Sequence, residues 1–432
     1  MKTYTIIVLL LLCSVFSFAQ GNGFVSKDSV EACYRDAVEL FSAERFDEAV
    51  VLLKKVADSG LVDAQYDYGL CCYNGTGVAE NPEEAVAWFR KAAFQGLADA
   101  QYTLGYCYEC GYGVEQSNEY AVEWYMLSAG QGYANAQAAL GIAYYSGSGV
   151  ERNYQVAAEW FRRAAEQSNA DAQSFLGTLY ANGNGVAQDY EKAAEWYKKA
   201  ADQGHPEGLY NLAYCYDYGL GVEWNGDKAI DLYKEAASRG LAVAQYELAL
   251  CYMDSKSEVE KEAALEWLYS AVAQEYADAQ YLLGQLYNEG KLVEKDYERA
   301  ARWFAMAAAQ DCADAQCDLG FLYLIGQGVR HDKELAIRWF VKAAESGNMR
   351  AQHNIGVCYY DGFGLEQSYD NAVTWFTLAS DQGFPDSKYY LGVCYNNGQG
   401  VLKDRKMAIK LLREAKKGGS KEAAEALKVL SE

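Results

Sequence analysis

Cysteine is the residue type in this 432-residue chain best suited to act as a nucleophile or a metal ligand. Eleven cysteines follow Cys13: Cys33, Cys71, Cys72, Cys107, Cys110, Cys215, Cys251, Cys312, Cys317, Cys358 and Cys394. An odd number leaves at least one thiol unpaired in an exported protein. Six share one position of a sequence repeat that alanine or leucine fills elsewhere: Cys71, Cys107, Cys215, Cys251, Cys358 and Cys394, against Ala143, Leu179, Leu286 and Leu322. This interchange predicts a small buried hydrophobe.

The spacing of these residues favours neither disulfides nor a metal centre. Cysteines at the same position of adjacent repeats are about 8–10 Å or more apart, one helix-packing step, whereas a disulfide needs Cα atoms within ~7 Å. The close pairs Cys71–Cys72 and Cys107–Cys110 would need further ligands nearby to hold a metal. Only three histidines are present, and none pairs with a cysteine or serine at motif spacing: His205, His331 and His353. We predict no metal and no cofactor.

Motifs of hydrolases and nucleotide-binding proteins are also missing from the sequence. Ser-x-x-Lys, Gly-x-Ser-x-Gly and His-Glu-x-x-His do not occur, so the serine hydrolase reading lacks its nucleophile. The glycine pairs, from Gly75/Gly77 to Gly398/Gly400, are followed by no third glycine or lysine, and they recur in eight repeats. That pattern indicates a turn at a helix end and not a phosphate-binding loop. We predict that the protein is not an enzyme.

The elements that position these residues recur with a fixed period. Eight of the nine tryptophans share one register with a step of 36 residues, broken by a single gap of 71: Trp88, Trp124, Trp160, Trp196, Trp267, Trp303, Trp339 and Trp375. The repeats run 61–96, 97–132, 133–168, 169–204, 205–240, 241–275, 276–311, 312–347, 348–383 and 384–419. Such a period predicts two helices in each repeat, stacked into an array.

Capping residues mark where the helices begin. An acidic or amide residue is expected to cap the first helix of each repeat: Asp63, Asp99, Asn135, Asp171, Asp278, Asp314 and Asp386. A sharper column precedes the second helix: Asn81, Ser117, Asn153, Asp189, Asn225, Asp296, Asp332, Ser368 and Asp404. We predict an all-α fold, a right-handed α-α superhelix (α-solenoid) of tandem 36-residue helix-turn-helix repeats with about 22 helices.

The repeat 241–275 departs from the pattern. It is one residue short and lacks both loop glycines, and we expect its second helix to have no N-cap of the usual residue types. A weak repeat lowers the coupling between its neighbours in a one-dimensional array. We expect a bend or preferred proteolysis between Met253 and Glu262.

The two ends of the chain differ from the repeats. Residues 1–19 read as a secretory signal peptide, with Lys2, a short apolar run and small residues before Gln20. Residues 20–28 are then a linker, 29–60 a degenerate N-terminal capping repeat, 61–419 the ten repeats and 420–432 a C-terminal capping helix. We expect an exported protein, periplasmic or secreted, with no transmembrane segment in the mature chain.

Charge restricts the class of partner. The chain has 38 lysines and arginines against 60 aspartates and glutamates, a formal net charge of −22. Such a surface repels phosphate backbones, so we expect no nucleic acid partner.

The repeat pattern resembles that of the Sel-one-like repeat family, a relative of the tetratricopeptide repeat. Residues 169–204 fit nearly throughout: Ala172, Leu176, Gly177, Tyr180, Gly183, Gly185, Val186, Asp189, Ala193, Trp196, Ala200, Ala201 and Gly204. The resemblance implies an adaptor or scaffold in protein complexes. Some cysteine-rich bacterial relatives are credited with weak β-lactam binding or hydrolysis, but their regular cysteine pair in each repeat is absent here, because no second helix contains a cysteine.

The candidate binding residues follow from the same resemblance, because first helices line the concave face in tetratricopeptide-like arrays. Large rings fill the sixth and tenth positions of several repeats: Tyr66, Tyr102, Tyr106, Tyr210, Tyr214, Tyr246, Tyr281 and Phe321. Neighbouring columns add polar residues: Asp67, Asn211, Asp217, Asn354 and Asp361. We predict a non-catalytic scaffold that binds a protein or peptide there; the alternatives are a carbohydrate or peptidoglycan-fragment binder and a weak β-lactam hydrolase. A competing interpretation is that these rings pack as core between helices.

Overall fold

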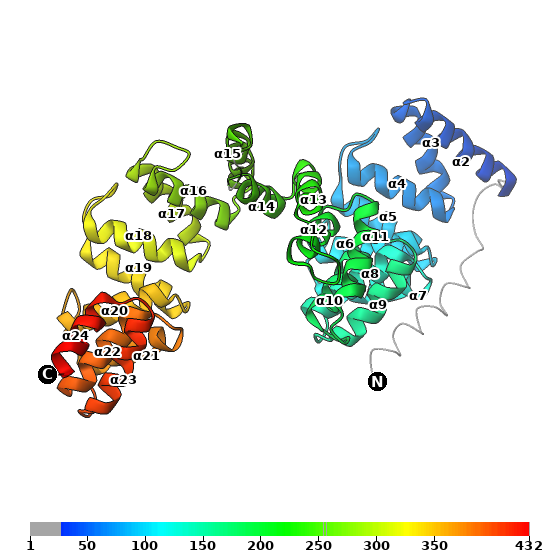
Figure 1. Ribbon diagram of the computed structural model, residues 1–432. Coiled ribbons are helices and arrows are strands. Elements are labelled where there is room, and N and C mark those ends of the chain that lie inside the picture. The colour runs from blue at the N-terminus through cyan, green and yellow to red at the C-terminus, as the bar shows by residue number, and fades with distance from the viewer. Residues whose placement is uncertain (1–26, 254, 256, 432) are drawn as a thin grey trace. The chain divides into compact units, whose positions relative to one another are not determined.

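The computed structural model describes residues 27–253, 255 and 257–431, and within these residues it contains 23 α-helices and no strand (Figure 1). The predicted all-α solenoid is confirmed for this part of the chain. The expected signal peptide, residues 1–19, lies outside it. No helix among the described residues has the length and apolar character needed to cross a membrane.

Two compact parts make up the chain, an N-terminal part that ends at Gln203 and a C-terminal part that begins at Gly204. The N-terminal part contains α2 (Lys27–Ser42), α3 (Phe46–Asp58), α4 (Val62–Asn74), α5 (Pro82–Phe94), α6 (Ala98–Cys110), α7 (Asn118–Gly130), α8 (Ala134–Ser146), α9 (Tyr154–Glu166), α10 (Ala170–Asn182) and α11 (Tyr190–Asp202).

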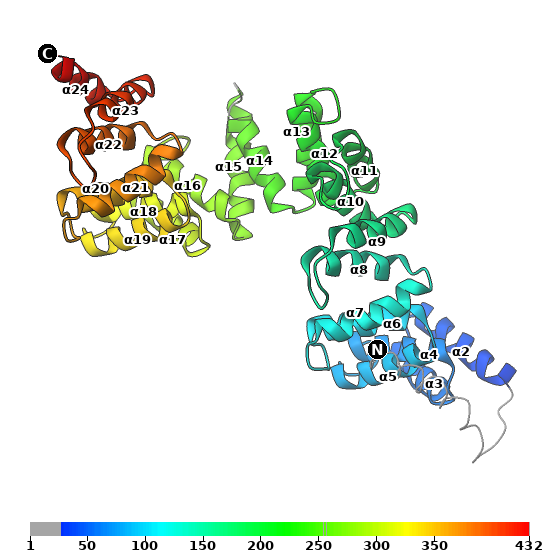
Figure 2. The same ribbon diagram turned by 90° about the horizontal axis from the view of Figure 1, so that it is seen from below.

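The C-terminal part continues the series of paired helices (Figure 2). It contains α12 (Pro206–Tyr218), α13 (Gly226–Ser238), α14 (Ala242–Met253), α15 (Glu258–Ala273), α16 (Ala277–Glu289), α17 (Tyr297–Ala309), α18 (Ala313–Ile325), α19 (Lys333–Glu345), α20 (Met349–Asp361), α21 (Tyr369–Asp381), α22 (Pro385–Asn397), α23 (Arg405–Lys417) and α24 (Lys421–Ser431). From α4 to α23, even-numbered helices are the first helices of the repeats and odd-numbered helices the second.

The predicted caps of the second helices are confirmed at all nine positions. At α5, for example, the Asn81 side chain accepts a hydrogen bond from the Glu84 backbone amide at 3.1 Å. The same arrangement recurs at Ser117, Asn153, Asp189, Asn225, Asp296, Asp332, Ser368 and Asp404. Each cap satisfies an amide that the helix itself leaves without a partner.

The prediction for the caps of the first helices was wrong by two residues. Helix α4 has Leu61 at its N-cap, and Asp63 lies inside the first turn. The Leu61 carbonyl already accepts the first helical hydrogen bond, from the Gln65 amide at 3.0 Å, so the helix begins earlier than expected. A carboxylate such as that of Asp63 then stabilises the positive end of the helix dipole without acting as a cap.

The second glycine of each pair permits close contact between successive repeats. Gly113 has a φ of 65°, and a Cβ atom there would lie 2.2 Å from the Pro82 carbonyl oxygen, at the start of the preceding second helix. Only a residue without a side chain fits both requirements. The glycine pairs are therefore structural.

A ladder of glutamines, which the sequence analysis missed, connects the repeats. The buried Gln101 side chain donates to the Ala93 carbonyl of the preceding repeat at 3.1 Å and accepts from Gln131 Nε2 at 2.8 Å. The glutamine pair recurs at 65/95, 137/167, 173/203, 245/274, 280/310 and 352/382. In the repeat 312–347, Ser346 stands at the donor position, and Gln316 Oε1 is buried without a partner among the described residues.

The irregular repeat 241–275 has a longer second helix than its neighbours. Helix α15 has 16 residues, against 13 in α13 and α17. Contrary to the prediction, its first turn is capped: Ser257 Oγ accepts from the Glu260 amide at 3.4 Å, because the longer helix begins outside the usual column. Leu292 replaces the second glycine of the next repeat and has a φ of 59°, a strained value for leucine.

Candidate binding face on the first helices

The first-helix face consists of the side chains at the sixth and tenth positions of the repeats. Hydrogen bonds join neighbouring first helices along it. In the N-terminal part, Tyr66 Oη lies 3.1 Å from Thr103 Oγ1. In the C-terminal part, Tyr281 Oη donates to Asp318 Oδ2 at 2.8 Å. In each part, a sixth-position tyrosine therefore links its first helix to the next one.

Rings at the sixth position pack against the second helix of their own repeat. Their ring centroids lie at nearly constant distances from the ring below: 5.7 Å for Tyr66–Phe89, 5.6 Å for Tyr102–Tyr125, 5.8 Å for Tyr210–Tyr233 and 5.7 Å for Tyr281–Phe304. These four sixth-position tyrosines, together with Tyr246 at the same position of its repeat, are half-buried. These five rings serve partly as core and partly as surface.

Rings at the tenth position lie at the surface. Tyr106 is 41% exposed, Tyr214 40% and Phe321 49%. The competing interpretation, that all the predicted rings are core, therefore fails for these three residues. These three rings are therefore accessible to a partner.

In the N-terminal part, the first-helix face is aromatic and acidic. Tyr125 Oη donates to the Glu109 carboxylate one turn beyond Tyr106, and Tyr34 Oη donates to the Asp67 carboxylate. Burial raises the pKa of Asp67, and the nearby charge of Asp63 raises it further. The Tyr34 hydrogen bond acts in the opposite direction and lowers that pKa. This surface suits a cationic or hydrogen-bond-donating partner.

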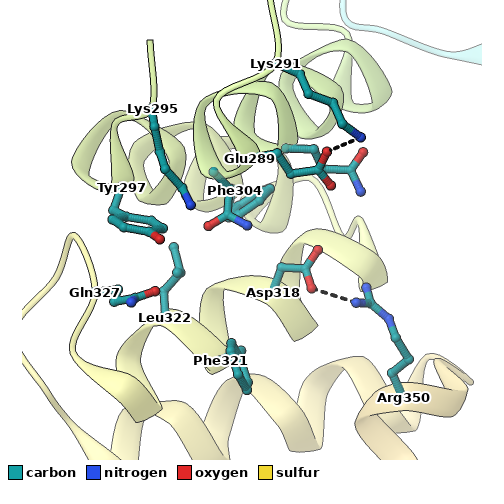
Figure 3. Close-up of a pocket in the computed structure, with 12 residues that line it drawn as sticks. Glu289, Lys291, Lys295, Tyr297, Phe304, Asp318, Phe321, Leu322, Gln327 and Arg350 are labelled. Atoms are coloured by element: carbon teal, nitrogen blue, oxygen red, sulfur yellow. Dashed lines mark hydrogen bonds and ion pairs between the residues drawn. The ribbon is translucent and has the colours of Figure 1, made fainter. Parts of the chain in front are cut away.

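In the C-terminal part, a hollow of about 660 Å³ opens beside Phe321, between α16, α18 and the start of α20 (Figure 3). Arg350 points toward Asp318, with Nη1 and Oδ1 2.8 Å apart, and its Nη2 lies 3.5 Å from Tyr281 Oη. Lys295 lines the hollow at the other end. The hollow joins an exposed ring to paired charges, which suits recognition of a polar side chain.

Helix α12 carries a third aromatic residue that the sequence analysis missed. Tyr218 follows Tyr210 and Tyr214 at the same four-residue step, so the three share one side of the helix. The Tyr214 and Tyr218 ring centroids lie 4.4 Å apart, and Tyr218 is exposed. The four-residue spacing of the tyrosines was the signal that could have revealed it.

Of the neighbouring polar residues predicted from sequence, Asp217 and Asn354 lie beside the face. Asp217 influences Glu247, an acid that the sequence analysis missed: burial raises the pKa of Glu247, and the charges of Asp217 and Asp278 raise it further. Asn354 Nδ2 lies 4.0 Å from Cys317 Sγ on the adjacent first helix.

The thiols at the shared cysteine position have the surroundings of core residues. Five of the six are buried, and Cys251 is half-buried. Burial raises the pKa of Cys107 to about 12. A thiol with such a pKa is almost entirely protonated at neutral pH and is a poor nucleophile.

One pair resembles part of a catalytic site, because His353 Nδ1 lies 2.9 Å from Ser387 Oγ. The sequence analysis missed it, since 34 residues separate the two. Ser387 has an exposed fraction of 0%, so no substrate carbonyl can reach its hydroxyl, and burial lowers the pKa of His353. The pair joins α20 to α22. No group of three or more His, Cys, Asp or Glu side chains suited to a metal occurs among the described residues.

Comparisons with known proteins agree with this architecture. The Sel1 repeat model matches ten segments: residues 62–97, 98–133, 134–169, 170–205, 206–241, 242–276, 277–312, 313–348, 350–384 and 385–420. No curated protein matches the chain.

Two solved structures extend the comparison. One is c5321, a protective antigen of uropathogenic Escherichia coli with an SLR fold, at 32% identity and a TM-score of 0.70 over 93% of this chain and 87% of that one. The other is a Sel1 repeat protein from Oxalobacter formigenes, at 31% identity and a TM-score of 0.53 over 73% of this chain and 94% of that one. With ten matched repeats and these two relatives, the chain belongs to the Sel1 repeat family.

Proposed function

We propose that this protein is an exported, non-catalytic scaffold that binds a protein or peptide on its first-helix face. Sel1 repeat proteins are in general protein-interaction scaffolds. The observation that carries the proposal for this face is the exposure of Tyr106, Tyr214 and Phe321 at one position of separate repeats.

Tyrosine and phenylalanine at these positions suit partner binding for a physical reason. A ring has only two side-chain torsions, so it loses little conformational entropy when a partner covers a large contact area. The backbone beneath is already fixed by glutamine pairs such as Gln101–Gln131. A preorganised surface reduces the entropic cost of association.

The proposal is tested by replacing exposed rings on the two kinds of helix. Tyr214→Ser and Phe321→Ser alter the first-helix face, while Tyr120→Ser and Tyr190→Ser alter exposed rings of second helices and serve as matched controls. We expect each first-helix change to weaken the binding of a captured partner by about 1–2 kcal/mol, roughly 5- to 30-fold in Kd. The melting temperature of the protein should not change. Equal effects from both pairs of variants would contradict the proposal.

The same experiment separates a protein partner from a carbohydrate, since exposed rings also stack on sugars. The captured partner is treated with a protease or with a glycosidase before it is offered again to the protein. A protein or peptide partner loses binding only after proteolysis. Loss after glycosidase alone would instead support a carbohydrate or peptidoglycan fragment.

A further inference from the structure

Three positions on neighbouring first helices form a polar cluster in the C-terminal part. In the α16–α18–α20 copy of this cluster, Tyr281 donates to Asp318, and Arg350 pairs with the same carboxylate at 2.8 Å. The arginine is held there by a second carboxylate as well, since Arg350 Nη2 lies 3.3 Å from Asp314 Oδ1. A guanidinium group thus fits between a tyrosine and an acid on this face.

A tyrosine and an acid occupy the first two of these positions on α12, α14 and α16 as well. Tyr210 corresponds to Tyr281, Glu247 to Asp318 and Asp278 to Arg350, each at the same place in its helix. The arginine position is therefore occupied by an acid. This second copy keeps the tyrosine and the carboxylate and lacks the cation.

The charges of the second copy are not neutralised by the chain. Burial raises the pKa of the half-buried Glu247, and the charges of Asp217 and Asp278 raise it further. None of the three forms an ion pair with a lysine, arginine or histidine within residues 27–253, 255 and 257–431. Tyr276 lies beside Asp278, and its hydroxyl supplies a hydrogen bond but no charge. Like charges held together without a cation destabilise the free protein.

A buried hydroxyl next to this copy also lacks a partner. Tyr233 is 1% exposed, packs 5.8 Å from the Tyr210 ring and has no hydrogen bond to its hydroxyl among the described residues. In the equivalent place, Tyr125 donates to Glu109, whose position in the repeat is that of Asp217. Aspartate is one methylene shorter than glutamate. The Tyr233 hydroxyl lies close enough to Asp217 and Glu247 for both charges, after burial, to raise its pKa, yet it makes no hydrogen bond among the described residues. Unused hydrogen-bonding capacity is costly for a buried group.

We propose that the Tyr210–Glu247–Asp278 cluster binds the guanidinium group of an arginine that the protein or peptide partner presents, in the place that Arg350 takes in the other copy. The inference rests on the proposed function and specifies one contact of the same face. Guanidinium suits the cluster better than an ammonium, because its planar set of N–H donors can bind two carboxylates at once. The exposed rings of Tyr214 and Tyr218 lie beside it on α12, where they can contact the flat guanidinium face by cation–π interaction.

The test uses a defined probe, because a chain with a net charge of −22 attracts any cation. The probe is a trifluoroacetyl-labelled Gly-Gly-Arg-Gly-Gly peptide, observed by ¹⁹F NMR line broadening with the full mature protein at physiological ionic strength, where long-range attraction is screened. The control peptide contains citrulline, the uncharged isostere of arginine. We expect the arginine peptide to bind at least about tenfold more tightly, as charge-assisted hydrogen bonds to carboxylates predict.

Variants locate the site. Glu247→Gln removes the central carboxylate, and Asp278→Arg supplies the cation from within the chain, so both are expected to lower arginine binding about tenfold or more. Glu266→Gln and Glu266→Arg make the same kinds of substitution at an exposed residue of α15. They are expected to leave the affinity for the arginine peptide within about twofold of that of the unchanged protein. Circular dichroism establishes that each variant is folded, and Asp278→Arg tests the site by itself if Glu247→Gln does not fold.

Two results would overturn the inference. One is equal or absent binding of the arginine and citrulline peptides at millimolar concentration; the other is equal loss in the cluster and Glu266 variants. Failure of the arginine site can be distinguished from failure of the proposed function. If the captured partner depends on Tyr214 but not on Asp278, the arginine site falls and the scaffold stands, whereas a partner that depends on neither contradicts both.

Discussion

Replacing Tyr233 by phenylalanine should stabilise the protein, although it removes a polar group from a native side chain. The ring is 1% exposed, and its hydroxyl has no partner among the described residues. Phenylalanine keeps the packing against Tyr210 and removes only the unsatisfied oxygen. Phe89, Phe161, Phe304, Phe340 and Phe376 occupy the same position in other repeats, so the ring alone fits this site.

The magnitude follows from what the hydroxyl loses on folding. A buried polar group without a partner costs about 1–3 kcal/mol. Because the denatured chain already buries part of its surface, we expect a gain at the lower end, about 1 kcal/mol for Tyr233→Phe. The matched change Tyr125→Phe removes a hydroxyl that donates to Glu109 and should cost about 1 kcal/mol. The two variants therefore differ in sign at equivalent positions.

Hydrogen–deuterium exchange is the suitable assay, because a repeat array does not unfold in a single cooperative step. Exchange of the α13 amides should slow in Tyr233→Phe, and exchange of the α7 amides should accelerate in Tyr125→Phe. A destabilisation of α13 equal to that of α7 would refute the reasoning, because it would show that the Tyr233 hydroxyl is satisfied in the free protein.

Three further predictions concern the repeats and the acidic cluster. Limited proteolysis should cut first between Met253 and Glu262, in the irregular repeat, and initial cutting at the Gly-x-Gly loops would contradict this. Ser346→Gln should restore the missing glutamine pair with Gln316 and stabilise that repeat by about 1 kcal/mol, measured as slower hydrogen–deuterium exchange of the α18 amides, and unchanged exchange would contradict it. Because burial raises the pKa of Glu247, the folded chain retains this proton at a pH where the unfolded chain has lost it. The contribution of Glu247 to stability should therefore grow as the pH falls from neutral through that raised pKa, and it should be lost as the pH rises again. Glu247→Gln should remove this part of the pH dependence, and an identical pH profile in the variant would contradict the assignment.

The period and the caps could be predicted from the sequence because they depend on local chemistry. Asn81 and its equivalents satisfy amides three residues away, so their role is visible in one repeat. The first-helix caps could not be located as well, since Asp63 is equally favourable as a cap and as a first-turn acid.

Features that depend on contacts between repeats were the ones the sequence analysis missed. Gln101 donates to the Ala93 carbonyl of the preceding repeat, and His353 lies within hydrogen-bonding distance of Ser387 in the next repeat. The sequence identified the aromatic residues at the sixth and tenth positions. It could not show that the tenth position is exposed and the sixth half-buried, because this difference depends on the second helix beneath each ring. The acidic cluster around Glu247 became visible only when three helices were placed together.

The central claim, that the first-helix face binds a protein or peptide, is tested most directly by photo-crosslinking in the native host. A p-benzoylphenylalanine residue is placed in the full chain instead of Tyr214 or Phe321, and in separate variants instead of Tyr120 or Tyr190 on second helices. We expect a protease-sensitive adduct from the two first-helix positions and none from the two controls. Adducts from the second-helix positions alone, or equally from all four, would contradict it.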